Sequence, residues 1–154
     1  MSRESSQDPA GKSSAISEIK WLPGDTDPVV WINVPKLDTS WKHDSDFYVS
    51  RGARGGETAD RLKYRKFGAW FRQSLPVLMP RITIDNGRIS FTNGRHRFAW
   101  LRDHGVCALP VTISPGKVAE VRRLFGTKSR TSRLFITRRK SRRPSTFVRR
   151  EVRS

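Results

Sequence analysis

The dipeptide Asn86-Gly87 constrains the fold of this chain most, because it predicts a β-hairpin whose strand register can be checked. Both central residues of a two-residue type I′ turn need positive φ, and Asn followed by Gly meets that need well. Folding the chain about the turn places apolar residues opposite one another on one face and polar residues on the other. The opposed pairs are Ile82 with Phe91, Ile84 with Ile89, Thr83 with Ser90 and Asp85 with Arg88. A shift by one residue would expose the apolar face, so the pattern specifies this register.

A turn, a helix and a further strand follow the hairpin. Thr92-Asn93-Gly94 predicts the turn, and residues 95–104 predict a helix closed by Gly105, which suits the left-handed position after a helix end. The apolar run over residues 106–113 is typical of a buried strand, with Pro110 at an edge or a bulge. Strand, turn, helix and strand in this order predict a crossover whose two flanking strands run parallel. We therefore expect a small α+β domain with a mixed sheet.

Three further elements lie outside this unit. Residues 29–34, bounded by Pro28 and Pro35, form a β-branched and aromatic run that is typical of a short strand. Residues 58–72 follow a glycine-rich stretch and have helical periodicity, and residues 118–125 predict a last amphipathic helix.

The helix predicted over residues 58–72 has an apolar side and a basic side. The apolar side consists of Ala59, Leu62, Phe67, Trp70 and Phe71. Lys63 falls on that apolar side as well. Its side chain either passes its neighbours to reach water or points into a site and meets an anion.

The net charge of +17, from 31 Lys and Arg against 14 Asp and Glu, is concentrated near one end of the chain. Residues 117–154 hold 14 basic residues against Glu120 and Glu151, a balance of +12. Self-repulsion and the scarcity of apolar residues argue against a packed element there. The expected division is a disordered leader over 1–15, a domain over 16–126 and a flexible basic tail over 127–154. The tail is either a solvated extension or a contact for nucleic acid, an acidic partner or an acidic membrane surface.

Composition excludes several classes of protein. No run of 18 apolar residues is present and the first residues contain no apolar segment, which argues against a spanning helix and a secretory signal. Cys107 is the single cysteine, which excludes a disulfide scaffold and a cysteine-rich zinc site, and we expect it to be a small core residue. A soluble cytoplasmic protein is expected.

The segment that carries chemistry is the start of the helix after the hairpin. Asn93 or Thr92 can cap this helix, Gly94 lets another group approach the backbone, and the free N–H groups of such a start attract anions. The first turn holds three basic side chains, those of Arg95, His96 and Arg97. The helix dipole disfavours cations there by up to about 1 kcal/mol, and no acidic residue of the same turn offsets them. A bound phosphate would offset these cations, because Arg chelates its oxygens bidentately and neutral His donates or accepts a proton.

Other interpretations of these residues stay open. The three basic side chains can also fan outward into water, with His96 merely packing. A general base for phosphoester hydrolysis is not singled out, and the candidates are Glu57, Asp60, Asp85 and Asp103. His43 and His104 are expected at the surface. No spacing of Asp and Glu predicts a metal site, so dependence on Mg²⁺ is left open.

The run ISFTNGRHRFAWLRDHGVCALPVTI resembles the ParB and sulfiredoxin superfamily, whose members carry a G-x-H-R or G-E-R-R type box at the start of this helix. Within that superfamily it is most similar to the plasmid fertility-inhibition factors, small proteins of conjugative plasmids that suppress DNA transfer by another plasmid. The clear resemblance covers residues 81–113, and the rest of 29–126 is compatible in order.

The resemblance implies roles for individual residues. His96 and Arg97 match the His and Arg that hold nucleotide phosphates in sulfiredoxins, and in ParB proteins the corresponding box holds the triphosphate of CTP. Arg95 stands where sulfiredoxins have their reactive cysteine, and Cys107 lies at the far end of the helix, so sulfiredoxin chemistry is not expected. With the helix-start argument, this predicts catalytic roles for His96 and Arg97 and a site for ATP or another nucleoside triphosphate. That site would consist of Asn93, Gly94, Arg95, His96, Arg97 and Lys63.

The fertility-inhibition relatives are associated with ATP hydrolysis and DNase activity, and with action at the coupling protein or secretion channel that delivers the transferred strand. We therefore expect a plasmid fertility inhibitor that binds nucleotide or DNA phosphates and has ATPase or DNase activity. The alternative is a non-enzymatic basic module that docks on the conjugation coupling protein or on DNA. The expected location is the cytoplasm, or its boundary at the inner face of the membrane.

Overall fold

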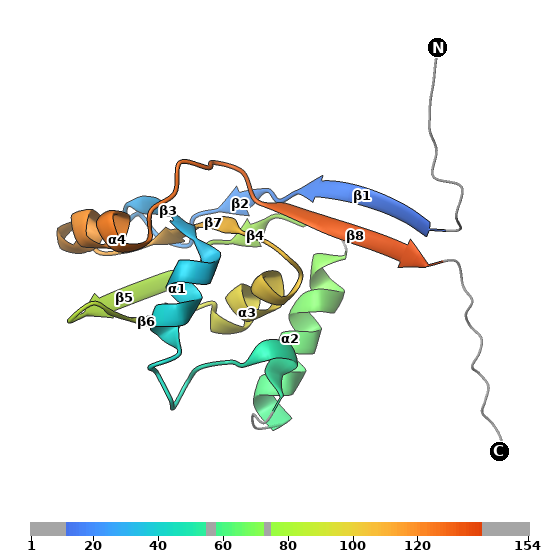
Figure 1. Cartoon of the computed structure of the whole chain (residues 1–154), viewed down its shortest axis with the longest axis horizontal. Helices are drawn as coiled ribbons and strands as arrows, with labels where there is room; N and C mark the ends of the chain where they lie inside the picture. Colours follow the sequence, from blue (N-terminus) through green and yellow to red (C-terminus); the bar gives the residue numbers. More distant parts are fainter. Residues whose placement is uncertain (1–11, 55–57, 73–74, 140–154) are drawn as a thin grey trace, which may run out of the picture. The chain divides into compact units, whose positions relative to one another are not determined.

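The computed structural model describes residues 12–54, 58–72 and 75–139, which form two compact units (Figure 1). In one unit the strands β1 (Lys12–Glu18) and β8 (Arg133–Arg139) pair in a two-stranded sheet. The other unit, Glu18–Leu134, holds the remaining described strands and the described α-helices. All residues of the predicted site belong to this larger unit.

The larger unit is built on a four-stranded mixed sheet in the order β3, β7, β5, β6. The strands are β3 (Val29–Asn33), β5 (Arg81–Asp85), β6 (Arg88–Asn93) and β7 (Ala108–Thr112). β3 and β7 are antiparallel, as are β5 and β6, and the two pairs join where β5 runs parallel to β7. At this junction Arg81 lies opposite Thr112, whose N–H donates to the carbonyl of Pro80 at 3.0 Å. The predicted α+β class with a mixed sheet is confirmed.

The hairpin has the predicted turn and register. Asn86 and Gly87 have φ values of 52° and 76°, as a type I′ turn requires. The Cα partners are Ile82 with Phe91, Thr83 with Ser90, Ile84 with Ile89 and Asp85 with Arg88. The three isoleucines are buried and the two hydroxyl residues are exposed, so the alternation of the sequence identified the correct face.

The predicted parallel crossover from the hairpin to β7 is wrong. Arg81 has Asn93, the end of β6, on one side and Thr112, the end of β7, on the other. β6 is antiparallel to β5 and β7 is parallel to it, so β6 and β7 approach Arg81 from opposite directions. Helix α3 (Arg95–Asp103) carries the chain onward from β6, and β7 brings it back. The predicted parallel direction fails because β7 runs parallel to β5, whereas β6 is the antiparallel hairpin partner of β5.

Strand β3 leads at once into a helix that the sequence analysis did not predict, α1 (Val34–Trp41). Pro35 ends the predicted strand, but it stands in the first turn of α1, where a missing N–H does no harm. The side-chain oxygen of Asn33 caps the helix by accepting the N–H of Lys36 at 2.9 Å. An Asn followed two residues later by Pro was therefore the available signal.

The predicted helices α2 (Thr58–Phe71) and α4 (Val118–Phe125) are confirmed. The predicted apolar side of α2 is confirmed in part, because Phe67 is buried and Trp70 and Phe71 are half-buried. Ala59, Leu62 and Lys63 are exposed, although the sequence analysis placed them on the apolar side. Two short 3₁₀ turns complete the helical structure, η1 (Arg51–Ala53) and η2 (Pro115–Lys117).

The side of α2 that faces α3 is spaced by three and four residues, as helix packing requires. It consists of Tyr64, Phe67, Gly68 and Phe71. Phe67 is buried and its ring centroid lies 5.5 Å from that of Trp100 on α3. A Cβ at Gly68 would collide with the Trp100 indole nitrogen, so the absence of a side chain there lets the helices approach closely.

The core lies between the four-stranded sheet and helices α1 and α3. Trp41 of α1 and Phe98 of α3 are fully buried, with ring centroids 5.6 Å apart at an interplanar angle of 86°. The Phe91 ring of β6 contacts both of them, at 4.5 Å and 5.0 Å. Fully buried aliphatic residues of the sheet are Val30, Ile32, Ile82, Ile89, Leu109 and Val111.

A buried guanidinium ties α3 to its neighbours. Arg102, whose side chain is 3% exposed, donates to Asp38 of α1 at 2.9 Å, to Asp103 at 2.8 Å and to the carbonyl of Val49 at 2.8 Å. Asp103 also accepts from the Tyr64 hydroxyl of α2 at 2.8 Å and from a backbone N–H of η1 at 2.8 Å. Burial opposes ionisation of Asp103, but these hydrogen bonds outweigh it and hold the pKa of its carboxyl below the usual value. The network therefore joins α1, η1, α2 and α3 around one cation.

Two expected boundaries and one expected core residue differ from the structure. The tail predicted from residue 127 includes β8, and Ser132 and Leu134 are buried, because the apolar residues at 134–136 permit a strand within the basic stretch. The leader predicted over 1–15 overlaps β1, whereas residues 1–11 and 140–154 lie outside the described residues. Cys107 is exposed, because the chain turns its side chain outward between the buried Val106 and Ala108.

Replacing Arg102 by Met should lower the free energy of unfolding by about 3–5 kcal/mol, because it removes the buried guanidinium that Asp38 and Asp103 share and leaves Asp103 only the exposed Arg51 at 3.6 Å. Urea denaturation followed by circular dichroism measures the change. Arg123→Met on α4, an exposed position, is the matched control and should shift stability by no more than about 0.5 kcal/mol. Equal losses in the two variants would show that the Arg102 network contributes little.

Candidate functional site

The start of α3 is shaped by Gly94. This residue is the N-cap, with φ of 87° in the left-handed region, and no side chain caps the helix. The prediction of Asn93 or Thr92 as cap is wrong, because β6 continues to Asn93 and both side chains are exposed. The first turn of α3 therefore keeps backbone N–H groups to which no side chain provides a cap, which suits an anion.

Two constraints require glycine at position 94. L side chains rarely adopt its φ, and a Cβ there would lie 2.6 Å from a terminal nitrogen of Arg97 and 2.9 Å from the Cα of Pro80. The start of α3 is thus pressed against the backbone that leads into β5. The predicted close approach at Gly94 is a contact within the protein.

Asp60 of α2 brings the first two basic residues of α3 together. Its Oδ1 accepts from an Arg95 guanidinium nitrogen at 3.1 Å and lies 2.8 Å from His96 Nε2. The side chains of Arg95 and Asp60 are each 23% exposed and that of His96 is 14% exposed, so the cluster is reached by water at its rim. As the sequence indicates, the first turn of α3 holds no acidic residue. The carboxylate that offsets Arg95 and His96 comes from another helix, α2.

The protonation of His96 follows from this contact. Burial lowers the pKa of His96 below its ordinary value of 6.5, although the hydrogen bond to Asp60 opposes the change. The imidazole is therefore neutral at pH 7. Because a carboxylate only accepts hydrogen bonds, the proton lies on Nε2, and Nδ1 carries a lone pair that can accept a proton. The hydrogen bond from His96, together with Arg95, holds the pKa of Asp60 below its usual value, so the carboxylate stays ionised.

Arg97 takes part in a different set of contacts. Its Nε donates at 3.1 Å to the carbonyl of Leu78 on the short strand β4 (Val77–Leu78), and its guanidinium lies over Gly94. Burial lowers its pKa from the usual Arg value. One terminal nitrogen is buried without a hydrogen-bond partner, an arrangement that costs about 1–3 kcal/mol for an ordinary polar group and more for a charged one.

The structure gathers part of the predicted site. Arg95 and His96 meet at Asp60, and the charge of the exposed Lys63 is close enough to influence the pKa of both Asp60 and His96. Arg97 and Gly94 lie together beside β4. Asn93 only ends β6, opposite Arg81.

Among the four candidates for a general base, Asp60 is the carboxylate that contacts the predicted site. Asp103 belongs to the Arg102 network, and Asp85 faces Arg88 across the hairpin. Glu57 lies outside the described residues. His104 is exposed and stacks on Trp100 with a centroid distance of 3.7 Å, and His43 is exposed too.

Phe47 is a site neighbour that sequence reasoning missed. Its carbonyl accepts from Arg95 at 3.0 Å, the Arg95 guanidinium lies 5.2 Å from its ring centroid, and the residue is 56% exposed. Phe47 stands in a polar stretch between α1 and η1 with no periodicity, so no sequence signal pointed to it.

Comparison with known families identifies the chain. The sequence profile of the family described as Plasmid Fertility inhibition factor matches residues 29–126, more than half of the chain. The chain belongs to this family. The matched segment begins with β3 and ends at the glycine after α4, so it contains α1, α2, the hairpin and the start of α3.

One solved structure resembles this member of the fertility inhibition family. It is the gold(I) cyanide derivative of Oncogenic Suppression Activity Protein, a plasmid fertility inhibition factor, with 22% identity and a TM-score of 0.48. The resemblance covers 66% of this chain and 57% of that chain, so the chain matches less than two thirds of the relative's length. No curated protein sequence matches the chain. Within the described residues, no helix has the length and apolar character to cross a membrane.

The donors at the start of α3 fit phosphate better than they fit a metal ion. The helix start lacks a capping side chain, so acceptor oxygens of a phosphate could accept from its backbone N–H groups, with the Arg97 guanidinium beside Gly94. No group of three His, Cys, Asp or Glu that could hold a metal is present in the described ranges. Any Mg²⁺ here would be held mainly by phosphate oxygens, with Asp60 as the nearby protein carboxylate.

Replacing Gly94 by Ala should destabilise this fertility inhibition factor by more than about 1 kcal/mol, because the new Cβ has an unfavourable φ and meets Pro80. Thermal unfolding checks this. Gly116→Ala is the control, because a Cβ at position 116 meets nothing within 4 Å and its φ is not in the left-handed region. An unchanged melting temperature for Gly94→Ala would contradict the tight contact.

The lowered pKa of His96 predicts a pH dependence of stability. The unfolded chain takes up a proton near pH 6.5, before the folded protein does, so the stabilising contribution is complete above that pH. It should be lost as the pH falls through the folded value. Urea denaturation of wild type and His96→Gln between pH 7.5 and 5 should show wild type losing stability relative to the variant. A constant difference across this range would argue against a buried neutral imidazole.

Proposed function

We propose that this chain suppresses conjugative DNA transfer and that it binds the phosphates of a nucleoside triphosphate or of DNA at the start of α3. Membership of the fertility inhibition family supports the first part. The second part is supported by the uncapped helix start with Gly94, next to Arg95, His96 and Arg97. We also propose kinship with the ParB and sulfiredoxin superfamily, on the G-R-H-R box at residues 94–97.

The observation that carries the proposal is the 2.8 Å contact between His96 Nε2 and Asp60, which leaves Nδ1 of the imidazole to act as the base. Its Nδ1 can take a proton from a water molecule while the water oxygen attacks phosphorus and the bond to the leaving oxygen breaks. Asp60 orients the ring and stabilises the imidazolium that forms, and Arg95 and the helix-start N–H groups stabilise charge on the phosphoryl oxygens. This arrangement supports hydrolysis of a phosphoanhydride bond of ATP or of a phosphodiester bond of DNA, whose leaving oxygen takes its proton from water.

A specific observation favours a second candidate, a non-enzymatic module that docks on DNA or on the coupling protein. Arg95 is already tied to Asp60 and to the Phe47 carbonyl, so part of its charge is compensated within the protein. In this case the cluster would bind phosphate without turnover. ATP and Mg²⁺ would then be dispensable for inhibition of transfer.

Replacing Arg97 by Ala should weaken ATP binding by about 1.5–3 kcal/mol, the range for hydrogen bonds to charged groups. Isothermal titration calorimetry of wild type and variant measures this. Arg72→Ala, an exposed position on α2's C-terminal side, removes the same charge and should leave the affinity nearly unchanged. Equal affinities in wild type and Arg97→Ala would place the phosphates elsewhere.

The enzymatic and binding candidates differ in the expected effect of His96→Gln. If His96 is the base, hydrolysis of ATP or single-stranded DNA should fall by about 10²–10⁴ while ATP affinity stays within a few-fold of wild type. Phosphate release and gel assays of the oligonucleotide measure turnover, and calorimetry measures binding. Binding by wild type without any turnover would favour the docking module, and unchanged turnover in His96→Gln would exclude His96 as base.

A further inference from the structure

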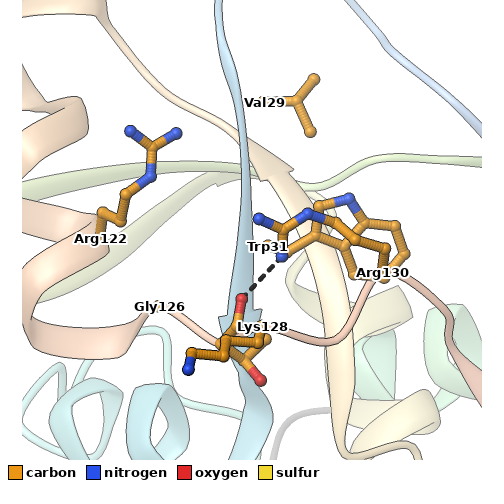
Figure 2. Close-up of a pocket in the computed structure, with 7 residues that line it drawn as sticks. Val29, Trp31, Arg122, Gly126, Lys128 and Arg130 are labelled. Carbon is orange, nitrogen blue, oxygen red and sulfur yellow. Dashed lines mark hydrogen bonds between the residues drawn. The ribbon is translucent and has the colours of Figure 1, made fainter.

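A cavity of about 410 Å³ lies on the larger unit beside strand β3 (Figure 2). We call it the basic groove, and its lining includes Val29, Trp31, Arg122, Gly126, Lys128 and Arg130. None of the predicted site residues lines it. Its volume lies within the range of about 300–1,000 Å³ that small-ligand sites occupy, so it is large enough for a nucleotide unit.

The backbone around the basic groove is closely packed. Gly126 follows α4, its N–H donates to the carbonyl of Arg122 at 2.9 Å, and a Cβ at position 126 would collide with that same carbonyl. The next residue, Thr127, donates its N–H to the Trp31 carbonyl at 3.1 Å, and Gly126 bridges Ile32 of β3. The end of α4 and the segment that leaves it are therefore fastened along the free edge of β3. The groove walls are set by backbone contacts.

Three cations surround the basic groove without a carboxylate among its lining residues. Arg122 and Lys128 are exposed, and Arg130 donates to the backbone carbonyls of Thr127 at 2.7 Å and Ser129 at 2.9 Å. In the part of the chain that the structure describes, no ion pair involves these three side chains. Their charge is available to an anionic ligand, and Arg130 is held in place by neutral acceptors.

Trp31 adds an aromatic surface to this charge. It alternates along β3 with the buried Val30 and Ile32, so its side chain lies on the side of the strand away from those core residues. The residue is half-buried, and Figure 2 shows it among Arg122, Lys128 and Arg130. A large aromatic ring at a charged cavity can stack on a nucleobase while the cations contact the adjacent phosphates.

We propose that the basic groove is a binding site for single-stranded nucleic acid. One unpaired base stacks on Trp31, and Arg122, Lys128 and Arg130 contact the backbone phosphates on either side of it. A duplex fits less well, because its bases are stacked on one another and cannot present a face to the indole. This site is separate from the proposed nucleotide site at the start of α3 and does not depend on it.

The test is fluorescence anisotropy with labelled oligothymidylate on the full-length protein. Trp31→Leu should weaken binding by about 5- to 150-fold, the range for losing one base–aromatic stack, and Trp31→Phe should retain most of the affinity. An oligonucleotide with abasic positions should bind wild type and Trp31→Leu equally. If Trp31→Leu binds oligothymidylate as wild type does, the stacking site is refuted. Trp31→Phe and the charge variants below decide the matter if Trp31→Leu does not fold.

The charge variants are compared over a salt series. Arg122→Gln and Lys128→Gln should each lower the slope of log affinity against log salt by about 0.7, the value for one phosphate contact to a single strand. Arg123→Gln removes the same charge from a neighbouring exposed position of α4 that does not line the groove, and should leave the slope unchanged. Equal effects of the three substitutions would overturn the proposal in favour of a diffuse electrostatic contact.

Further binding comparisons identify the ligand. Oligouridylate against oligothymidylate distinguishes RNA from DNA as the source of the single strand. Equal or tighter binding of a DNA duplex, or of poly-glutamate, with the same loss in Arg122→Gln would overturn the proposal. Calorimetry with ATP reports on the site at the start of α3, whereas the loss of oligothymidylate affinity in Trp31→Leu reports on the basic groove, so failure of one site and failure of the other give different results.

Discussion

The buried Arg102 guanidinium is the interaction on which the arrangement of the helices depends. Its hydrogen bonds reach Asp38 of α1, Val49 before η1 and Asp103, which in turn accepts from Tyr64 of α2. α2 is therefore held at a set distance from α3, and this places Asp60 within hydrogen-bond reach of Arg95 and His96. The contact that decides the protonation of His96 is a consequence of an ion network about two helical turns away.

The larger unit presents two positively charged sites of different character. At the start of α3 the cations are partly compensated by Asp60, and a neutral imidazole with one free nitrogen stands among them. In the basic groove the three cations have no ion-pair partner among the described residues, and an indole provides an apolar surface. The first arrangement suits proton transfer at a phosphate, whereas the second suits sequence-tolerant retention of a strand. Both lie within the segment that matches the family profile or border it closely.

Local sequence patterns correctly predicted the turns, helices and strands that depend on neighbouring residues. The Asn86-Gly87 turn and its register, the helix after Gly94 and the buried strand that follows were all confirmed, because turn chemistry and alternation decide them. Contacts between distant segments were not predicted: Asp60 contacts His96 from another helix, and Phe47, which contacts Arg95, lies in a stretch without periodicity. The outward orientation of Cys107 was not predicted either. The parallel direction predicted for β6 and β7 was wrong for the same reason, since their relative direction depends on the pairing of β7 with the more distant β5. Helix α1 was not predicted, although Asn33 and Pro35 indicate its start.

The pairing of β3 with β7 has a consequence for the order in which the chain folds. These strands lie about 75 residues apart in the sequence, while β5 and β6 are joined by two residues. Loop closure over such a distance is slow relative to formation of a hairpin, which takes microseconds. We expect the hairpin and α3 to assemble first and β3 to dock afterwards on the free edge of β7. During synthesis β3 leaves the ribosome before β7 does, so its apolar residues stay unpaired until β7 has emerged.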